Sequence, residues 1–212
     1  MIRTVSCEER CCWIVGAGEF YAPAFSPRQG DFIIAADAGY RYLEQLGVRP
    51  DCALGDFDSL GWVPDEPDLK VFSPIKDDPD MMLAAREGLS RGFRRFKLLG
   101  GLGGRLAHSV ANLQVLEFLS RRGARAFLTG EHETATAISD GESISFSAQY
   151  HGYLSAFCLS SGARVTMRNL KYELDGGTLE PFRPLGLSNE FIGRDAMVRV
   201  ERGTIVLMWE TQ

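Results

Sequence analysis

From its first residues to about residue 130, the chain repeats one pattern: a short apolar run, a turn of small or acidic residues, and an amphipathic stretch. The runs are apolar throughout instead of alternating, which is typical of strands that are covered on both faces. Strands of this kind that alternate with helices predict βα units and a parallel sheet. The runs occupy residues 12–15, 32–36, 52–54, 69–72, 96–99 and 126–128.

Two of the amphipathic stretches carry clear helix signals. Asp78 followed by Pro79 predicts a helix start, because Asp is a preferred N-cap residue and Pro is favoured at the first helical position. This helix is expected over residues 81–89, ending near Gly92. A later stretch predicts a helix that stops at Gly123 and buries an apolar face made of Leu106, Val110, Leu113 and Leu116.

After about residue 135 the pattern changes to short alternating runs separated by glycine-rich turns. This alternation is typical of antiparallel strands. The sequence therefore predicts an α/β chain of two domains: an N-terminal, Rossmann-like parallel-sheet domain over residues 1–135 and a small antiparallel β domain over residues 136–212. The alternating runs lie at residues 143–146, 154–158, 164–167, 197–200 and 204–209.

Composition excludes several classes of function. The 212 residues carry a formal net charge of −5, so no phosphate-neutralising surface for DNA or RNA is expected. No apolar run approaches the roughly 18 residues of a membrane span, and residues 1–9 are too polar for a signal peptide. We therefore expect a cytoplasmic protein with no nucleic-acid or membrane partner.

The chemically informative residues follow the predicted strands. Ligands of open α/β sheets collect beyond the carboxyl ends of the strands, where loop amides and helix N-termini converge. Five strands in this chain deliver glycines or carboxylates to that edge, namely Gly16 and Gly18, Asp37, the Gly55–Ser59 segment, the Lys76–Asp80 segment and the Gly100–Arg105 segment.

Asp56 and Asp58 are separated by one residue, so their side chains point the same way in an extended segment. Mg²⁺ prefers hard oxygen ligands of this kind, completed by water and substrate phosphates. The pair therefore predicts a shared Mg²⁺ site. The alternative is a turn, because Gly-Asp-x-Asp-Ser is also good turn chemistry.

Lys76, Asp77 and Asp80 favour the metal and phosphate interpretation, because they add a cation for phosphate and further acid at a helix start. Asp80 has a second explanation, since an acid near a helix N-terminus also complements the helix dipole. That explanation does not extend to Lys76 and Asp77.

The cluster of glycines from Gly100 to Gly104 permits close backbone approach, and Arg105 offers a planar fork that matches phosphate oxygens. Its place after a strand and before a helix is the context of phosphate-binding loops; a flexible loop with a surface Arg is the alternative. His108, in the first helical turn, is either a phosphate donor or proton shuttle, or a helix-end His in solvent or bonded to a loop.

Several segments together resemble the thiamine pyrophosphokinase family. Residues 36–59, from Ala36-Asp37-Ala38-Gly39 to Gly55-Asp56-Phe57-Asp58-Ser59, are similar to its first signature. Lys76-Asp77-Asp78-Pro79-Asp80 is similar to its Lys-Asp-x-Thr-Asp signature, and residues 103–108 with Asn112 are similar to its Gly-Gly-Arg-x-Asp-His segment. Residues 170–172 and 187–190 resemble the part of its β domain that contributes to the thiamine pocket.

The resemblance implies an N-terminal α/β domain that binds ATP and Mg²⁺, a C-terminal β-sandwich, and a homodimer with thiamine near the subunit interface. The implied reaction transfers a pyrophosphoryl group from ATP to thiamine and gives thiamine diphosphate and AMP. The implied metal ligands are Asp56, Asp58 and Asp80, and Asp77 is implied to accept the hydroxyl proton. The implied nucleotide-binding residues are Asp37, Lys76, Arg105, His108 and Asn112, and the implied thiamine-binding residues are Tyr172, Ser188 and Asn189.

The sequence departs from the family pattern at two positions. Pro79 replaces Thr, which suits a helix start. Ala107 replaces Asp, so an acid of the nucleotide and metal site is missing unless Asp77 or Asp78 compensates. For Tyr172, a strand aromatic in the core is the alternative to an aromatic face for the cationic thiamine rings.

Two rival functions remain at this stage. A nicotinamide-dependent oxidoreductase is indicated by Gly16-x-Gly18 after a first strand and by Asp37 after the second. However, the third glycine position of that fingerprint is Tyr21, and Asp56 and Asp58 are left without a role. The other rival is a non-catalytic protein of the same fold that binds thiamine or a nucleotide, which the missing acid at Ala107 allows.

Overall fold

A computed structural model describes residues 10–75 and 77–211. The chain divides into two compact units, Met1–Ser109 and Val110–Gln212. The expected boundary at residue 135 lies later in the chain than this division. Residues 125–129 form a strand that pairs antiparallel with the strand that follows it, so they belong with the second unit.

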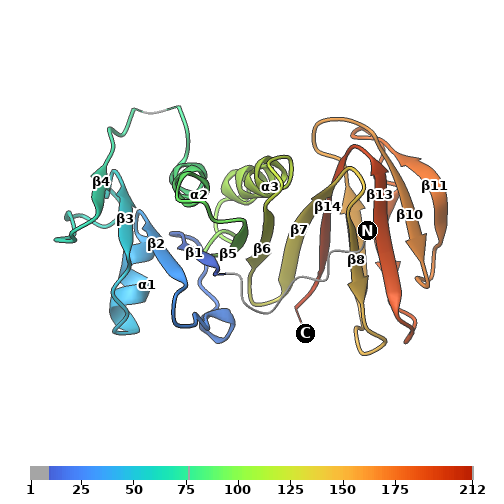
Figure 1. Cartoon of the computed structure of the whole chain (residues 1–212), viewed down its shortest axis with the longest axis horizontal. Helices are drawn as coiled ribbons and strands as arrows, with labels where there is room; N and C mark the ends of the chain where they lie inside the picture. Colours follow the sequence, from blue (N-terminus) through green and yellow to red (C-terminus); the bar gives the residue numbers. More distant parts are fainter. Residues whose placement is uncertain (1–9, 76, 212) are drawn as a thin grey trace. The chain divides into compact units, whose positions relative to one another are not determined.

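The first unit contains a five-stranded parallel sheet, formed by five of the six predicted apolar runs (Figure 1). The sixth run, residues 126–128, lies instead in the antiparallel strand of the second unit. The order of the strands is β5-β1-β2-β3-β4. All four residues of β1 and of β3 are buried, which matches their unbroken apolar sequences. The strands are β1 (Cys12–Val15), β2 (Phe32–Ala36), β3 (Cys52–Gly55), β4 (Leu69–Val71) and β5 (Arg95–Leu99).

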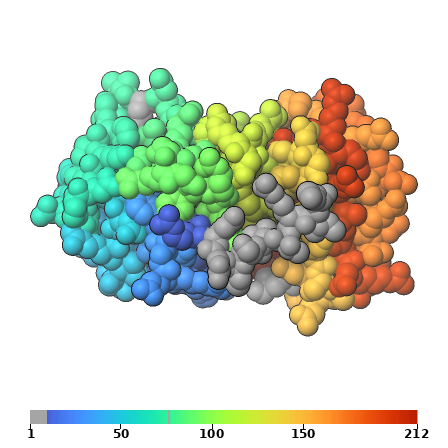
Figure 2. Space-filling model, viewed as in Figure 1, coloured from blue at the N-terminus to red at the C-terminus, as the bar shows by residue number. Residues whose placement is uncertain are grey.

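Two α-helices pack on this sheet after a short 3₁₀ turn, η1 (Ala22–Ala24). Helix α1 (Gly39–Gln45) contacts β1 and β2, and α2 (Asp80–Ser90) contacts β1, β2 and β3. Helix α2, in green, forms part of the outer surface in Figure 2.

Helix α2 begins at Asp80, whereas Asp78 as N-cap and Pro79 as first helical residue predicted a start one residue earlier. The N-cap position is taken by Pro79, which has an extended backbone, and no side chain caps the helix there. The predicted N-cap residue Asp78 is instead paired with Arg86, 2.8 Å away. The ion pair thus uses the carboxylate that capping would have needed.

Helix α3 (Leu106–Ser120) has a different buried face from the predicted one. Of the predicted face, Leu116 is fully buried and Leu113 is half-buried, but Leu106 is 78% exposed and Val110 is 45% exposed. Val115 and Leu119, which were not predicted, are fully buried. Apolar residues occur on more than one side of this helix, so spacing alone did not identify the side that packs.

The chain reverses direction across the sheet between β1 and β5. It proceeds outward from β1 to β4 and then returns to β5 on the other side of β1. Such a switch point is where open α/β sheets bind ligands. The loops after these two strands are joined by hydrogen bonds from Gly16 N to the Leu99 carbonyl (2.8 Å) and from Gly18 N to the Gly100 carbonyl (2.7 Å).

Gly100 is required at this junction. Its φ is +65°, and a Cβ there would lie 2.2 Å from the carbonyl oxygen of Gly16. No other residue type allows the two loops to approach this closely.

The second unit contains two antiparallel sheets that share one core, which is the predicted β-sandwich (Figure 1). The strand orders are β12-β9-β14-β7-β6 and β11-β10-β13-β8. The strands are β6 (Arg125–Thr129), β7 (Glu133–Ser139), β8 (Ser143–Phe146), β9 (Tyr153–Phe157), β10 (Ala163–Arg168), β11 (Leu174–Leu179), β12 (Gly186–Glu190), β13 (Ala196–Arg202) and β14 (Thr204–Glu210).

The sandwich core is formed by inward-facing side chains of both sheets. Leu154 and Leu207 come from one sheet, and Val165 and Val198 come from the other. Phe146 lies at the centre of an aromatic group in which its ring centroid is 5.2 Å from that of Trp209. Within the described residues, no helix is long and apolar enough to cross a membrane.

Asp31 ties the start of the first unit together. Its carboxylate accepts hydrogen bonds from Cys11 N (2.8 Å), the Trp13 indole (2.9 Å) and Arg28 N (2.9 Å). Burial alone would raise the pKa of Asp31, but these hydrogen bonds outweigh it and hold the pKa below its ordinary value.

We expect Asp31→Asn to lower the free energy of unfolding by about 1–3 kcal/mol, because an amide accepts fewer of these bonds and carries no charge. The loss should be complete above about pH 4, the ordinary pKa of Asp. It should shrink as the pH falls through the lower pKa of the folded protein. Urea unfolding of both proteins at neutral and acidic pH measures this difference. Equal stability at neutral pH would contradict the role assigned to Asp31.

Candidate active site

Asp37 is the first residue after β2 and lies at the carboxyl edge of the sheet. It adopts a left-handed backbone conformation with φ +50°, and its amide donates to the Leu54 carbonyl (2.8 Å). Although Asp37 is only 7% exposed, its Oδ1 atom has no hydrogen-bond partner among the described residues. A buried carboxylate oxygen of this kind is costly and is typical of a site that binds something.

Asp56 is brought to Asp37 by Gly55, the last residue of β3. Gly55 has φ +150°, and a Cβ there would lie 2.9 Å from the Cα of Asp37. Asp80 is contributed by a different element, since it is the first residue of α2. Carboxylate oxygens of Asp37, Asp56 and Asp80 all lie within 4.8 Å of one another.

This group fits a divalent metal ion. Mg²⁺ is bound by hard oxygen ligands, commonly carboxylates completed by water and phosphate. Three carboxylates repel one another when they are this close, and a cation between them relieves the repulsion. The unpartnered Oδ1 of Asp37 supplies a ligand atom that no protein group occupies.

Asp58 lies outside this group. The residue between the two aspartates, Phe57, has φ +59° and is 2% exposed, so the segment is not extended and its middle side chain enters the core. The amide of Asp58 donates to Asp56 Oδ1 (3.2 Å), while the Asp58 side chain is exposed. The premise that both carboxylates point the same way is therefore wrong, and the turn alternative describes the local backbone.

Asp77 and Asp80, both of the Lys76–Asp80 segment, lie in different surroundings. Asp77 is exposed and is not a member of the carboxylate group, whereas Asp80 is. Asp80 also stands in the first turn of α2, so the helix-dipole explanation holds alongside the metal one. Lys76 lies outside the described residues.

The glycine-rich loop presents Arg105 and His108 on its exposed side. The Arg105 guanidinium donates to Nε2 of His108. Gly103 (φ +76°) and Gly104 (φ +63°) both adopt left-handed conformations, and Gly104 N donates to Glu19 Oε1 (3.3 Å). The loop thus places the Arg105 guanidinium at an exposed position where it can meet an anion.

A second cluster with metal-ligand atoms, Cys52, Asp68 and Glu87, is explained by its cations. Glu87 pairs with Lys70 (2.6 Å) and Arg91 (2.6 Å), and Arg91 also pairs with Asp68. Burial raises the pKa of the Cys52 thiol to about 12, so it stays protonated and is a poor ligand. We interpret this cluster as an ion-pair network.

The remaining sequence-predicted residues belong to the second unit. Asn189 is buried and holds the backbone at Tyr172 from both sides: its Oδ1 accepts from Tyr172 N (2.9 Å) and its Nδ2 donates to the Tyr172 carbonyl (2.7 Å). Tyr172 is 60% exposed, which excludes the core alternative. Ser188 is exposed with φ +54°, and Asn112 is buried on α3.

Comparison with known proteins decides the family. The protein-family model described as "Thiamin pyrophosphokinase, catalytic domain" matches residues 27–128. A second family model, described as "Thiamin pyrophosphokinase, vitamin B1 binding domain", matches residues 142–205. The chain belongs to the thiamine pyrophosphokinase family. The oxidoreductase alternative is not favoured by any of these matches.

Relatives agree over most of the chain. A thiamine pyrophosphokinase of Bacillus subtilis (strain 168) is 25% identical over 185 residues, which are 84% of this chain and 86% of the relative. A crystal structure of thiamine pyrophosphokinase from Bacillus subtilis superposes with a TM-score of 0.81 at 22% identity, covering 96% of this chain and 100% of that one. The Candida albicans enzyme has a TM-score of 0.73 at 16% identity, covering 96% and 90%. These structures support the fold.

Sequence reasoning placed Asp37 with the nucleotide-binding residues and did not include it among the metal ligands. The signal was present, because Asp37 directly follows β2 and Asp56 directly follows β3, and these two strands are neighbours in the sheet. Parallel neighbours deliver their following residues to the same edge, so adjacency in the sheet was more informative here than adjacency in sequence.

We expect Asp37→Asn to raise the Tm of the metal-free protein, because it removes a buried charge whose oxygen has no partner. The same change should weaken Mn²⁺ binding roughly tenfold or more, about 1.4 kcal/mol. Asp58→Asn is the matched control, an acid-to-amide change outside the carboxylate group, and should alter both properties little. Differential scanning calorimetry and Mn²⁺ titration by electron paramagnetic resonance measure the two effects. Loss of Mn²⁺ binding in Asp58→Asn alone would return that residue to the metal site.

Proposed function

We propose that this protein transfers a pyrophosphoryl group from ATP to thiamine, giving thiamine diphosphate and AMP. The observation that carries the proposal is the match of both the catalytic and the vitamin B1 binding domain models, in order, along one chain. The three carboxylates suited to a metal, those of Asp37, Asp56 and Asp80, lie within the segment that the catalytic-domain family model matches.

Asp37, Asp56 and Asp80 would hold Mg²⁺, whose chemistry would be neutralisation of the charge on the ATP phosphates. Arg105 and the amides of the glycine-rich loop would bind phosphate oxygens, with Lys76 as a further cation. His108 orients the Arg105 guanidinium through their hydrogen bond. This chain therefore contributes mainly alignment and charge, which is what phosphoryl transfer demands.

In the reaction, the hydroxyl oxygen of thiamine forms a bond to the β-phosphorus of ATP. The bond from that phosphorus to the oxygen that bridges it to the α-phosphate breaks, and AMP leaves with the bonding electrons. The hydroxyl proton passes to a carboxylate, for which we propose Asp77, an exposed residue just before α2.

We assign thiamine to the second unit. Asn189 fixes the backbone of Tyr172 through two hydrogen bonds, and Tyr172 presents an exposed ring. An aromatic face attracts a cationic ring system such as that of thiamine. Ser188 offers a hydroxyl next to Asn189 in the same strand, β12.

We further propose a cytoplasmic homodimer that associates through the second unit. Strand β12 is at the edge of its sheet. Exposed apolar side chains are concentrated in the strands and loops around it, which is typical of an association surface. These side chains are Tyr153, Tyr172, Phe182, Leu185, Leu187 and Ile192.

Incubation with ATP, Mg²⁺ and thiamine tests the function directly. We expect AMP and thiamine diphosphate in equal amounts, with no AMP when thiamine or Mg²⁺ is left out. A non-catalytic homologue would bind thiamine without forming AMP, and that result would overturn the proposal.

Tyr172→Ala should raise the KM for thiamine by roughly tenfold, since an aromatic contact to a desolvated cation contributes up to about 2 kcal/mol, and should leave the KM for ATP unchanged. Tyr172→Phe keeps the aromatic face and should behave like the wild type. Steady-state kinetics with each substrate varied in turn measures both effects. Equal losses for the two substrates would argue against the assignment of thiamine to the second unit.

Ala107 is exposed in the first turn of α3, where an acid is favoured by the helix dipole and the family carries Asp. If that acid orients Arg105 or assists the metal, Ala107→Asp should raise kcat/KM by roughly tenfold, which corresponds to about 1.4 kcal/mol in the barrier. Ala107→Asn is the uncharged control and should give no gain. An unchanged or lower kcat/KM for Ala107→Asp would mean that other carboxylates already complete the site.

A further inference from the structure

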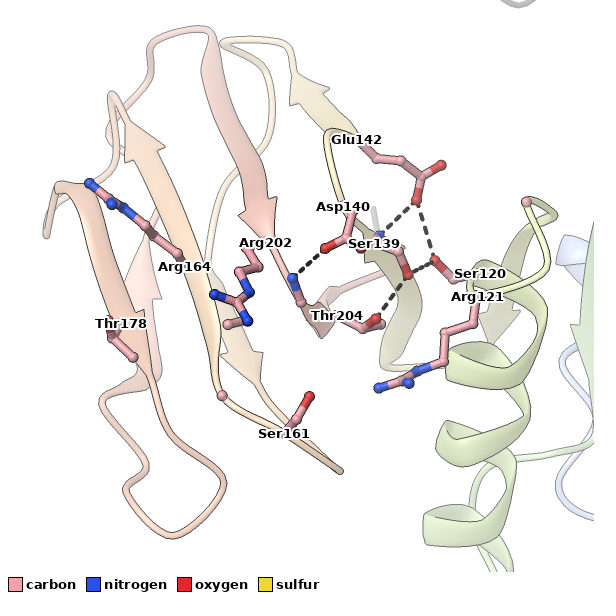
Figure 3. A pocket seen from close by; sticks show the side chains of 14 residues that line it. Ser120, Arg121, Ser139, Asp140, Glu142, Ser161, Arg164, Thr178, Arg202 and Thr204 are labelled. Carbon is pink, nitrogen blue, oxygen red and sulfur yellow. Dashed lines mark hydrogen bonds between the residues drawn. The ribbon is translucent and has the colours of Figure 1, made fainter.

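The second unit contains a cavity at one end of its sandwich, with a volume of about 970 Å³ (Figure 3). Its walls come from the turn between β7 and β8, the loop before β10, the turn between β13 and β14, and the C-terminal end of α3. None of the residues proposed above for thiamine, nucleotide or metal lines it. The volume falls within the range of roughly 300–1,000 Å³ that is typical of small-molecule sites.

One wall of the cavity carries Asp140 and Glu142, but both carboxylates accept hydrogen bonds from other groups of the protein. Glu142 Oε2 accepts from Ser139 N (2.8 Å) and Ser120 Oγ (3.3 Å). Asp140 Oδ1 accepts from Gly203 N across the turn between β13 and β14. Both acids therefore serve to fix the loops that surround the cavity.

Hydroxyl groups continue this fixed wall. Ser139 Oγ lies 2.7 Å from Ser120 Oγ and 3.0 Å from Thr204 Oγ1, and Ser120 and Thr204 are buried. Such a connected network joins α3, β7 and β14 and holds the cavity wall in one arrangement.

The opposite wall carries arginines without acidic partners. Arg164 on β10 is directly opposite Arg202 on β13 and opposite Thr178 on β11. Like charges in directly opposed positions destabilise a sheet unless a counter-charge is present. No ion pair to either arginine occurs among the described residues, although Arg121 on the α3 side is paired with Glu117 (2.7 Å).

An irregularity in the sheet produces this arrangement. The register between β10 and β13 shifts between Arg164 and Val165, which leaves Glu201 out of the pairing. The Glu201 carboxylate accepts from Thr166 Oγ1 (2.6 Å) and is used there. Bulges of this kind re-aim side chains next to functional sites.

The two guanidinium groups point in different directions. Figure 3 shows the Arg202 side chain, which lines the cavity, on the side of Thr204 and Ser161, and the Arg164 side chain directed away from them. This separation is expected for two like charges with no anion between them. A planar guanidinium inside a cavity with hydroxyl neighbours matches the oxygens of a phosphoryl group.

We propose that this cavity binds a phosphorylated small molecule, with Arg202 as the principal phosphate ligand and the Ser161 hydroxyl as a donor. The cavity is larger than a phosphate group, so the rest of the ligand would occupy the space along Ser139 and Thr204. This inference goes beyond the proposed function and does not depend on it, because the cavity shares no residue with the transfer site.

Titration of the ¹⁵N-labelled protein with inorganic phosphate in buffer containing EDTA tests the proposal. EDTA removes divalent cations, so that metal-mediated binding in the first unit does not contribute. We expect saturable shifts of the amide resonances of Asp140, Ser161 and Gly203. Arg202→Gln should weaken binding roughly tenfold or more, which corresponds to about 1.4 kcal/mol. Arg199→Gln, on the same strand but outside the cavity, should bind like the wild type.

Two further variants keep the test decisive. Arg202→Lys retains the charge without the fork and should bind with intermediate affinity, whereas Arg164→Gln, whose side chain is directed away from the cavity, should bind like the wild type. Absence of saturable shifts at millimolar phosphate would overturn the proposal. Shifts confined to the glycine-rich loop near Arg105, or unchanged affinity in Arg202→Gln and Arg202→Lys, would overturn it equally.

Discussion

The close approach of Asp37 to Asp56 is the constraint on which the candidate active site depends. It requires a glycine at position 55, because a Cβ there would lie 2.9 Å from the Cα of Asp37. It also leaves Oδ1 of Asp37 buried with no partner in the part of the chain that the structure describes, and it places two acids near Asp80. The folded chain thus carries an electrostatic cost that a bound cation would offset, which is typical of sites selected for binding instead of stability.

The parallel sheet could be predicted closely because its signal is local. Residues 12–15 and 32–36 were expected as strands and are strands with those bounds, since four or five consecutive apolar residues suit only an element covered on both faces. Strand β7 was missed, because Glu133–Ser139 crosses the expected domain boundary at residue 135. Strands β11 and β12 were missed, because Leu174–Leu179 and Gly186–Glu190 are rich in glycine and polar residues. Their pairing is supplied by neighbouring strands, which a local pattern does not record.

The site was predictable in position but not in detail. Strand ends correctly directed attention to one edge of the sheet, and Asp56 and Asp80 were chosen from it. Asp58 was chosen on the assumption of an extended backbone, which the positive φ of the buried Phe57 breaks. A single left-handed residue changes which side chains meet, and its cause lies in the packing of Phe57 into the core.

The two units differ in the sign of the charged groups that lack a partner among the described residues. In the first unit the buried Oδ1 atom of Asp37 has no hydrogen-bond partner among the described residues, so its environment favours a cation. In the second unit the acids around the end cavity accept from backbone and hydroxyl donors, while the opposed Arg164 and Arg202 form no ion pair within residues 10–75 and 77–211, so that environment favours an anion. A net charge of −5 describes neither location. Because binding depends on local, partly desolvated charge, the ligand chemistry of this chain is determined by which groups its fold leaves unsatisfied.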